Sequence, residues 1–404
     1  MIDEQTTTIS TVLLKHDKMP SKHIETRVYF PNLNSIRFIA AFLVIIHHIE
    51  LFKYMTGVPS EGNKVIGMIG KLGVVLFFVL SGFLISYLLF KEKEVTSTIS
   101  IRKFYLRRIL RIWPLYFLIV LSAFFVFPFI SFLTLPGLEK SVVWEDFGLK
   151  LSLYVLFLPN LALYMFKMLP YAAQAWSIGA EEQFYLIWPA LNKRVNNKWA
   201  LMFGVIILYL GIKFVAIYLL PQTSAVLLFN QFWYATPIDC MAIGGIFALI
   251  AFENSSFTTI IKKILFSKWC QWGTLFFTVA LISQGVYIKY YLHFEFYAVL
   301  FGILICNFAC NPKPIFSMEY KILNYLGKIS YGLYMFHTVA IVFSIRILEK
   351  AGILSDHILY PLAIVISIFI SAASYEWYEK RFIVKKVKYS NIISGDSVRI
   401  KANI

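Results

Sequence analysis

One long apolar stretch of the chain contains an arginine and two histidines. In RFIAAFLVIIHHIE, Arg37 opens the stretch, and His47 and His48 lie near its far end. Arg37 and His48 are eleven positions apart, so in a helix both project from one face, roughly 16 Å apart along the axis, while His47 points elsewhere. Ionisable groups inside a bilayer commonly line a cavity, and a neutral imidazole can act as a base or nucleophile. In the alternative interpretation, Arg37 reaches the inner headgroups and the histidines belong to the outer interface.

A second polar group lies in AWSIGAEEQFYLIWP. Glu181 and Tyr185 are four residues apart there and share a helical face. We expect Glu181 to pair with His48 across a helix bundle and to fix the imidazole tautomer. An ordinary interfacial carboxylate is the alternative.

A third group is cationic. In RKFYLRRILRIWPLYF, the residues Arg107, Arg108 and Arg111 recur at helical spacing. Guanidinium groups can fork onto phosphate oxygens, so the cluster suits a polyanion. In the alternative interpretation, the arginines only set the orientation of the chain in the membrane.

Single polar residues interrupt other apolar stretches. Ser81 precedes Gly82, and such small residues let helices pack closely. His337 lies seven residues beyond Ser330, on the same helical face, either as a site residue or as a packed, hydrogen-bonded histidine. Asp239 is an intramembrane acid that requires a partner, which the sequence does not name. The four cysteines lack the spacing of metal ligands, so we expect no metal site.

The composition requires a membrane to surround these residues. Of the 404 residues, 59% are hydrophobic, 18% aromatic and only 15% charged, more apolar surface than a soluble domain of this size can bury. The net charge of +16 falls in short clusters between apolar stretches, as topology requires, and forms no continuous basic face. We therefore expect contact with membrane lipids and no nucleic-acid partner.

The apolar stretches predict an all-α, polytopic bundle of about ten transmembrane spans. A bilayer needs about 20 apolar residues per helix. The expected spans are residues 34–53, 67–90, 111–131, 177–192, 199–220, 234–253, 268–287, 291–309, 329–347 and 357–377. Residues 150–166 are expected to be re-entrant or to lie along the outer surface.

Positive charge orients these spans. Short cytoplasmic loops carry the excess of Lys and Arg, so the segment KEKEVTSTISIRKFYLRRILR and the basic tail KRFIVKKVK are expected inside. With ten spans, both termini are cytoplasmic. We expect a polar N-terminal segment over 1–33 with no cleaved signal peptide, a membrane domain over 34–382, and a basic cytoplasmic tail over 383–404.

Together, these motifs resemble the integral-membrane acyltransferase 3 family over nearly the whole chain, from about residue 34 to 382. The matching pieces are the spacing of Arg37 and His48, FFVLSGFL around Ser81, FYLRRILRIWPLY, Trp176-Ser177-Ile178 with Glu181 and Phe184-Tyr185, and ISYGLYMFH with Tyr331 and His337. Five pieces in the right order make a strong signal. One departure is Thr236-Pro237-Ile238-Asp239, which lacks the arginine found there in many members, so no role for that arginine is carried over.

The resemblance implies a membrane-embedded acyltransferase that moves an acyl group, usually acetyl, from cytoplasmic acyl-CoA to a hydroxyl of an extracytoplasmic or lipid-linked sugar. It assigns catalysis to His48, Glu181 and Arg37, with His48 as base or transient acyl carrier, and binding of the acyl-CoA co-substrate to Arg107, Arg108 and Arg111. The supporting residues are Ser81, Trp176, Tyr185, Asp239, Tyr331 and His337. The expected location is a bacterial inner membrane. The alternative function is a glycolipid or polysaccharide transporter that uses the same polar cavity as a proton relay.

Overall fold

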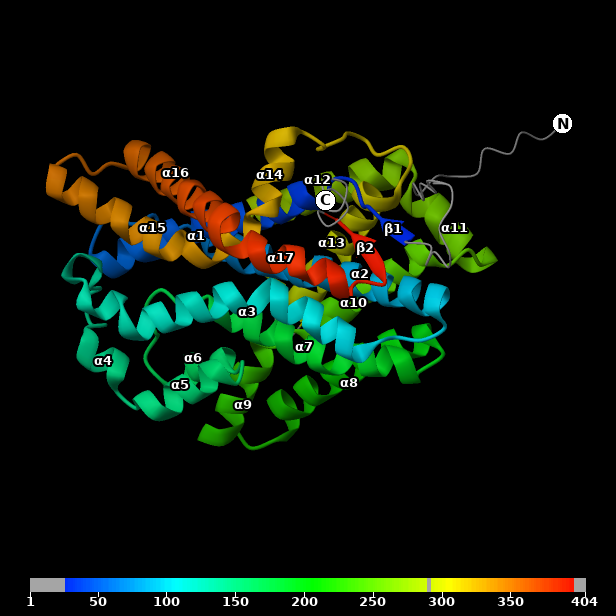
Figure 1. Cartoon of the computed structure of the whole chain (residues 1–404), viewed down its shortest axis with the longest axis horizontal. Coiled ribbons are helices and arrows are strands. Elements are labelled where there is room, and N and C mark those ends of the chain that lie inside the picture. Colours follow the sequence, from blue (N-terminus) through cyan, green and yellow to red (C-terminus); the bar gives the residue numbers. More distant parts are fainter. Residues whose placement is uncertain (1–25, 289–291, 396–404) are drawn as a thin grey trace.

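The computed structural model describes residues 26–288 and 292–395, so the expectations for residues 1–25 and for the last nine residues fall outside the described part. The chain forms a bundle of helices (Figure 1). The long helices are α1 (Leu33–Thr56), α2 (Lys64–Thr96), α3 (Ile101–Phe125), α7 (Ala175–Arg194), α8 (Lys198–Phe214), α9 (Ser224–Tyr234), α10 (Ile238–Phe252), α12 (Lys268–Ser283), α13 (His293–Cys310), α15 (Ser330–Ala351) and α16 (Asp356–Ser374).

Shorter elements connect and extend these helices. They are the helices α4 (Lys140–Trp144), α5 (Phe147–Val155), α6 (Pro159–Met165), α11 (Ser256–Leu265), α14 (Lys321–Lys328) and α17 (Lys380–Lys386), the 3-10 turns η1 (Phe127–Phe129), η2 (Ser131–Leu133) and η6 (Val387–Tyr389), and the π-helical turns η3 (Val215–Leu219) and η5 (Tyr375–Glu379). Through η5 and α17, α16 continues almost without a break into the basic tail.

The predicted helical membrane bundle is confirmed at the level of its helices. Within the described residues, eight segments are long and apolar enough to cross a membrane: Leu33–Thr56, Lys64–Thr96, Ile101–Phe129, Lys198–Leu219, Ser224–Phe252, His293–Cys310, Ser330–Ala351 and Asp356–Tyr389. The two other expected spans are also helical, as α7 and α12, but α7 carries two adjacent glutamates and α12 has only 16 residues. Length and apolar character therefore support eight spans directly.

The ambiguous stretch at residues 150–166 contains no continuous helix. Helix α5 ends at Val155 and α6 begins at Pro159, and between them Phe157 adopts a left-handed backbone conformation with φ of 58°. The stretch is thus two short helices joined by a sharp turn.

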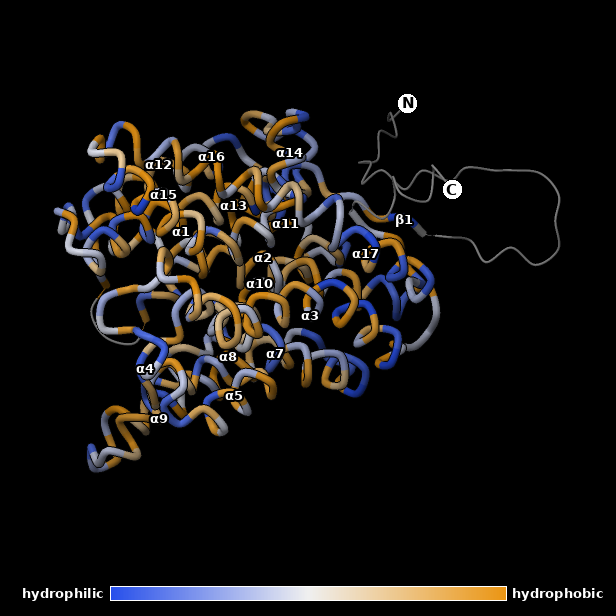
Figure 2. The backbone as a smooth tube through the Cα atoms, turned by 60° about the vertical axis from the view of Figure 1, so that its left-hand side comes forward, coloured by the Kyte–Doolittle hydropathy of each residue, from blue (hydrophilic) through white to orange (hydrophobic). Residues whose placement is uncertain are grey.

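The outward faces of several helices carry large apolar side chains. Ile207 on α8 is 68% exposed and Phe369 on α16 is 71% exposed. Folded soluble proteins rarely leave such surfaces to water, whereas lipid tails cover them without cost. In Figure 2, hydrophobic residues run along the central helices, and hydrophilic residues gather around α17.

Helices α2 and α10 form the centre of the bundle through close backbone contact. A Cβ atom on Gly82 of α2 would collide with the backbone of Met241, and one on Gly244 of α10 would collide with the carbonyl of Val79. Small residues at such crossings let dispersion contacts hold helices together in lipid. This contact confirms the packing role expected at Gly82.

Two short strands, which the sequence did not predict, join the ends of the described chain. Strand β1 (Thr26–Val28) pairs in parallel with β2 (Ile392–Ser394), and both lie beside α17 at one end of the bundle (Figure 1). Three-residue strands have no readable periodicity, and their partners lie more than 300 positions apart, so only tertiary structure reveals the pair.

Candidate active site

A cavity of about 200 Å³ lies among α1, α2, α3, α7 and α15. It brings together seven of the residues that the sequence had marked as a possible site: Arg37, Ser81, Arg108, Arg111, Glu181, Tyr185 and Tyr331. They come from five helices, so the bundle gathers side chains that are far apart along the chain. Terminal residues around β1, β2 and α17 also line the cavity.

A chain of hydrogen bonds crosses one wall of this cavity. The Tyr185 hydroxyl donates to Glu181 Oε2 at 2.7 Å, and Ser81 Oγ lies 2.5 Å from the same hydroxyl. Because the single proton of Tyr185 is directed to Glu181, Ser81 is the donor in the second contact. Ser81 therefore has a polar role beside the packing role of Gly82.

The charge lining the cavity is mainly positive. Arg37 donates from Nη1 to Asn34 Oδ1 at 3.0 Å, and the Arg108 guanidinium carbon lies 5.7 Å from the ring centroids of both Phe104 and Tyr185. Among the described residues that line the cavity, Glu181 is the one acid. A partly enclosed space with this excess of cations attracts an anion.

His48 lies further along α1, against a second histidine. The centroids of the His48 and His337 rings are 4.7 Å apart, with a 73° angle between the ring planes. The Nδ1 atom of His48 is 2.9 Å from the Val44 carbonyl, and that of His337 is 2.8 Å from the Tyr334 carbonyl. Since a carbonyl only accepts, each Nδ1 carries a proton, which leaves each Nε2 with a lone pair. His48 is half-buried and His337 fully buried.

An aromatic pair in the cavity wall includes the ring that contacts His337. Phe77 and Tyr334 both line the cavity, and their ring centroids are 5.8 Å apart. The Tyr334 ring lies 6.0 Å from His337, and its hydroxyl is 2.7 Å from Ser177 Oγ. His48 itself is not among the described residues that line the cavity.

The expected pairing of Glu181 with His48 does not form in this structure. The Glu181 carboxylate is bound by Tyr185, whereas the Val44 carbonyl and the His337 ring orient His48. His47 was expected to point elsewhere, and its Nδ1 does lie 3.0 Å from the Ile66 carbonyl, but its ring also packs edge-on against that of His48, with centroids 5.0 Å apart.

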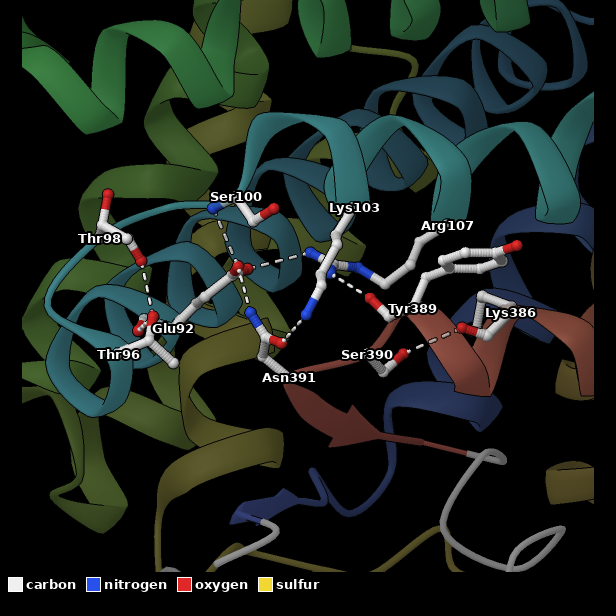
Figure 3. A network of polar contacts seen from close by, with 10 residues as sticks. All are labelled: Glu92, Thr96, Thr98, Ser100, Lys103, Arg107, Lys386, Tyr389, Ser390 and Asn391. Atoms are coloured by element: carbon white, nitrogen blue, oxygen red, sulfur yellow. Dashed lines mark hydrogen bonds and ion pairs between the residues drawn. The ribbon is translucent and has the colours of Figure 1, made fainter. Parts of the chain in front are cut away.

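Arg107 is directed away from the main cavity. Its Nη2 donates to Glu92 Oε2 at 3.0 Å and its Nη1 to the Tyr389 carbonyl at 2.9 Å (Figure 3). The three arginines are therefore not equivalent, because Arg108 and Arg111 face the cavity and Arg107 binds the tail.

Two more of the predicted residues lie outside the cavity. Trp176 packs edge-on against Phe78, with ring centroids 6.1 Å apart, while the next residue, Ser177, lines the cavity. Asp239 is completely buried on α10, where Glu295 is a neighbouring acid. Lys213 donates to that glutamate at 2.8 Å, so Asp239 belongs to a separate buried charge cluster.

Phe77, Tyr334 and Lys386 are among the cavity-lining residues that sequence reasoning did not mark as site residues. Tyr334 stands one helical turn before His337 on α15, a spacing that could have flagged it as a neighbour of that ring. Lys386 was included among the basic tail residues and had no distinguishing signal. Phe77 is one of 38 phenylalanines in an apolar chain, so only its position in the bundle identifies it.

Comparison with known proteins gives a consistent result. The family model for the acyltransferase domain of the acyltransferase 3 family matches residues 30–376. O-acetyltransferase OatA of Staphylococcus aureus is 29% identical over 336 residues, which cover 78% of this chain and 51% of that protein. Peptidoglycan O-acetyltransferase OatA of Listeria monocytogenes is 25% identical over 339 residues, covering 80% of this chain and 51% of that protein. The chain thus spans about half the length of these relatives, and no solved structure matches it significantly.

Proposed function

The chain belongs to the acyltransferase 3 family of integral-membrane proteins, and we propose that it transfers an acyl group, acetyl above all, from cytoplasmic acyl-CoA to an extracytoplasmic sugar hydroxyl. One observation carries the proposal. Helix α1 contributes Arg37 to the lining of the cationic cavity, and further along the same helix His48 packs against His337. A cationic cavity and a neutral imidazole that are linked by α1 suit a donor that is charged at one end and reactive at the other.

The donor's phosphates bind at the cationic end of the cavity. Coenzyme A carries its phosphate groups far from the thioester, joined by an uncharged pantetheine arm. Arg108 and Arg111 each donate paired hydrogen bonds to phosphate oxygens, and Arg37 lies at the start of α1 beside them. The arm extends past Ser81 and Tyr185 towards Tyr334.

The thioester reaches His48 only when the aromatic pair moves. Phe77 and Tyr334 both line the cavity, and Tyr334 contacts His337, so we infer that this pair closes the path to the histidines and rotates when the donor binds. The Tyr334 hydroxyl exchanges its contact with Ser177 for the donor at that step. Closure without a donor keeps water from crossing between the two sides of the membrane.

Two balanced chemical routes fit the His48 ring. In the first, Nε2 takes the proton of the acceptor hydroxyl, the oxygen attacks the thioester carbonyl, and the departing CoA thiolate recovers the proton. In the second, Nε2 attacks the thioester and CoA leaves as the thiolate; the acceptor hydroxyl then attacks the acyl group on the ring, the bond to Nε2 breaks, and the hydroxyl proton passes to the thiolate. His337 supports the charged His48 ring in both routes, since its Nε2 has no partner among the described residues.

The acceptor is a sugar hydroxyl outside the cytoplasmic membrane, in a polymer or linked to lipid. One of the relatives is named as acting on peptidoglycan, so peptidoglycan sugars are the first acceptors to test. His48 retains partial exposure, and the acceptor approaches it from the end of α1 that is remote from Arg37.

The topology that suits this reaction has ten spans, with α7 and α12 crossing alongside the eight apolar segments. Both termini are then cytoplasmic in a bacterial inner membrane. Pairing of β1 with β2 supports an even number of spans, because it holds the two terminal segments side by side. The arginines and the tail then share the cytoplasmic side.

A transfer assay tests the function. Membranes that contain the native chain, His48→Ala or the neighbouring control His47→Ala are incubated with acetyl-labelled acetyl-CoA and soluble muropeptides. The native chain and His47→Ala label the acceptor, and His48→Ala lowers the rate by about a hundredfold or more. Transfer that survives in His48→Ala removes this ring from the mechanism, and glycolipid export without any transfer supports a transporter.

A further inference from the structure

The C-terminal segment packs across the cationic end of the cavity. Ile383, Lys386, Ser394 and Gly395 all line it, together with residues of the N-terminal segment around Phe30. The segment therefore forms part of the cavity wall and is not a free basic tail.

Specific contacts hold this segment in place (Figure 3). The Glu92 carboxylate, only 2% exposed, accepts hydrogen bonds from Asn391 Nδ2 at 3.0 Å, Ser100 N at 3.1 Å and Arg107 Nη2 at 3.0 Å. Lys103 Nζ donates to Asn391 Oδ1 at 2.8 Å. Asn391 is thus bound from both sides and joins the tail to α2 and α3.

The strand pair extends this attachment to the N-terminal side. Arg27 lies opposite Ile393 and Val28 opposite Ser394 in the β1–β2 pair, and the Gly395 amide donates to the Val28 carbonyl at 3.3 Å. With φ of 57°, Gly395 turns the chain directly after β2 in a conformation that glycine adopts at little cost. The segment is fixed at Asn391 and again at the strands.

Between α3 and the strands, the segment presents one cation to the cavity. Lys386 is half-buried and lines the cavity together with Arg37, Arg108 and Arg111, whereas its neighbours Lys385 and Lys388 are exposed. Four cations from three different elements therefore surround a space with one lining acid. Such a number of converging cations matches a ligand with several phosphate groups.

We propose that the segment from Ile383 to Gly395 completes the acyl-CoA site, and that Lys386 binds a donor phosphate together with the arginines. The inference rests on the proposed function and assigns to the tail a binding role in the same reaction. The Glu92, Arg107 and Asn391 contacts position the segment, and Lys386 touches the donor.

Kinetics with two donors test this role. The native chain, Lys386→Ala, Lys386→Arg and the control Lys385→Ala are compared with acetyl-CoA and with acetyl-pantetheine, which carries the thioester without phosphates. Lys386→Ala raises KM for acetyl-CoA about tenfold, the scale of one charged hydrogen bond, with kcat within about twofold. It leaves acetyl-pantetheine kinetics unchanged, Lys386→Arg recovers most of the affinity, and Lys385→Ala behaves like the native chain.

A double substitution checks that the tail acts through Lys386. Asn391→Ala loosens the segment and raises KM for acetyl-CoA about threefold, as expected for the loss of a positioning contact. In the double variant with Lys386→Ala, KM equals that of Lys386→Ala alone. If the two substitutions raised KM independently, so that the double variant had the product of the two increases, Asn391 would not act through Lys386.

The outcomes separate this inference from the proposed function. The role of Lys386 is overturned if Lys386→Ala and Lys385→Ala have equal KM values for acetyl-CoA, or if Lys386→Ala raises KM equally for both donors. Neither result affects the proposed transferase activity. A native chain that binds CoA in a calorimeter but transfers no acetyl overturns the transferase. In that case, weaker CoA binding by Lys386→Ala still supports the phosphate contact.

Discussion

Glu181 is held in a cavity wall by a neutral donor and by nearby cations. Tyr185 donates to its carboxylate, and Arg108 stacks over the same tyrosine ring. A buried carboxylate requires both hydrogen bonds and compensating charge, because burial removes its hydration. The contacts of Tyr185 therefore fix the position of the Glu181 carboxyl group in the cavity wall.

Tyr185→Phe tests this arrangement at the residue scale. The phenyl ring keeps the packing but removes the donor to Glu181 and the acceptor for Ser81, and each polar group left unpaired costs about 1–3 kcal/mol. We expect a lower melting temperature in detergent and slower acetyl transfer. Ser81→Ala removes the Ser81 hydroxyl and one hydrogen bond, so its effect is smaller. A larger loss for Ser81→Ala than for Tyr185→Phe would contradict this hydrogen-bond chain.

The sequence predicted most of the charged residues that line the cavity, but not the contacts of His48, the ring proposed to react. Helical spacing was enough to place Arg108 and Arg111 on one face, because that spacing is a local property. The contact between His48 and His337 depends on how α1 packs against α15, which no local pattern encodes. The expected Glu181–His48 pair failed for the same reason.

At the scale of elements, α1 connects the cationic cavity with the histidine pair. Its first turns place Arg37 in the cationic cavity, and its last turns place His48 against α15. Helix α2 lies beside it and fixes its position through further contact with α10. The close crossing of α2 and α10 at Gly82 and Gly244 therefore determines the geometry of the cavity wall.

Two alanine substitutions on α2 test that crossing. Gly82→Ala adds a methyl group against the Met241 backbone, whereas Gly67→Ala adds one in open space. Overpacking of this kind costs about 1–3 kcal/mol, so Gly82→Ala should lower the melting temperature in detergent. Gly67→Ala should leave it unchanged or slightly raised, because alanine favours helix. Equal melting temperatures would show that α2 and α10 do not cross this closely.

At the scale of the whole molecule, the two terminal segments meet at one end of the bundle. Hydropathy predicted the long helices because about 20 consecutive apolar residues are required to cross lipid. It did not predict the β1–β2 pair or the role of the tail, since both depend on contacts between distant parts of the chain. The basic tail was recognised only by its charge.

Reporter fusions test the arrangement of the termini. With both termini cytoplasmic, a green fluorescent protein fused after Ile404 fluoresces, and an alkaline phosphatase at the same site is inactive. A phosphatase inserted after Gln222, in the turn between η3 and α9, should be active, because the proposed ten-span arrangement places that turn outside. Active phosphatase at the C-terminus would overturn the ten-span arrangement.

The most direct test of the central claim separates donor and acceptor by the membrane itself. The native chain and His48→Ala are reconstituted in vesicles with labelled acetyl-CoA sealed inside and muropeptides outside. We expect the native chain to label the external acceptor, and His48→Ala to label it at least about a hundredfold more slowly. Label that appears only when donor and acceptor share one side, or that appears equally fast with His48→Ala, would contradict transfer across the membrane through this site.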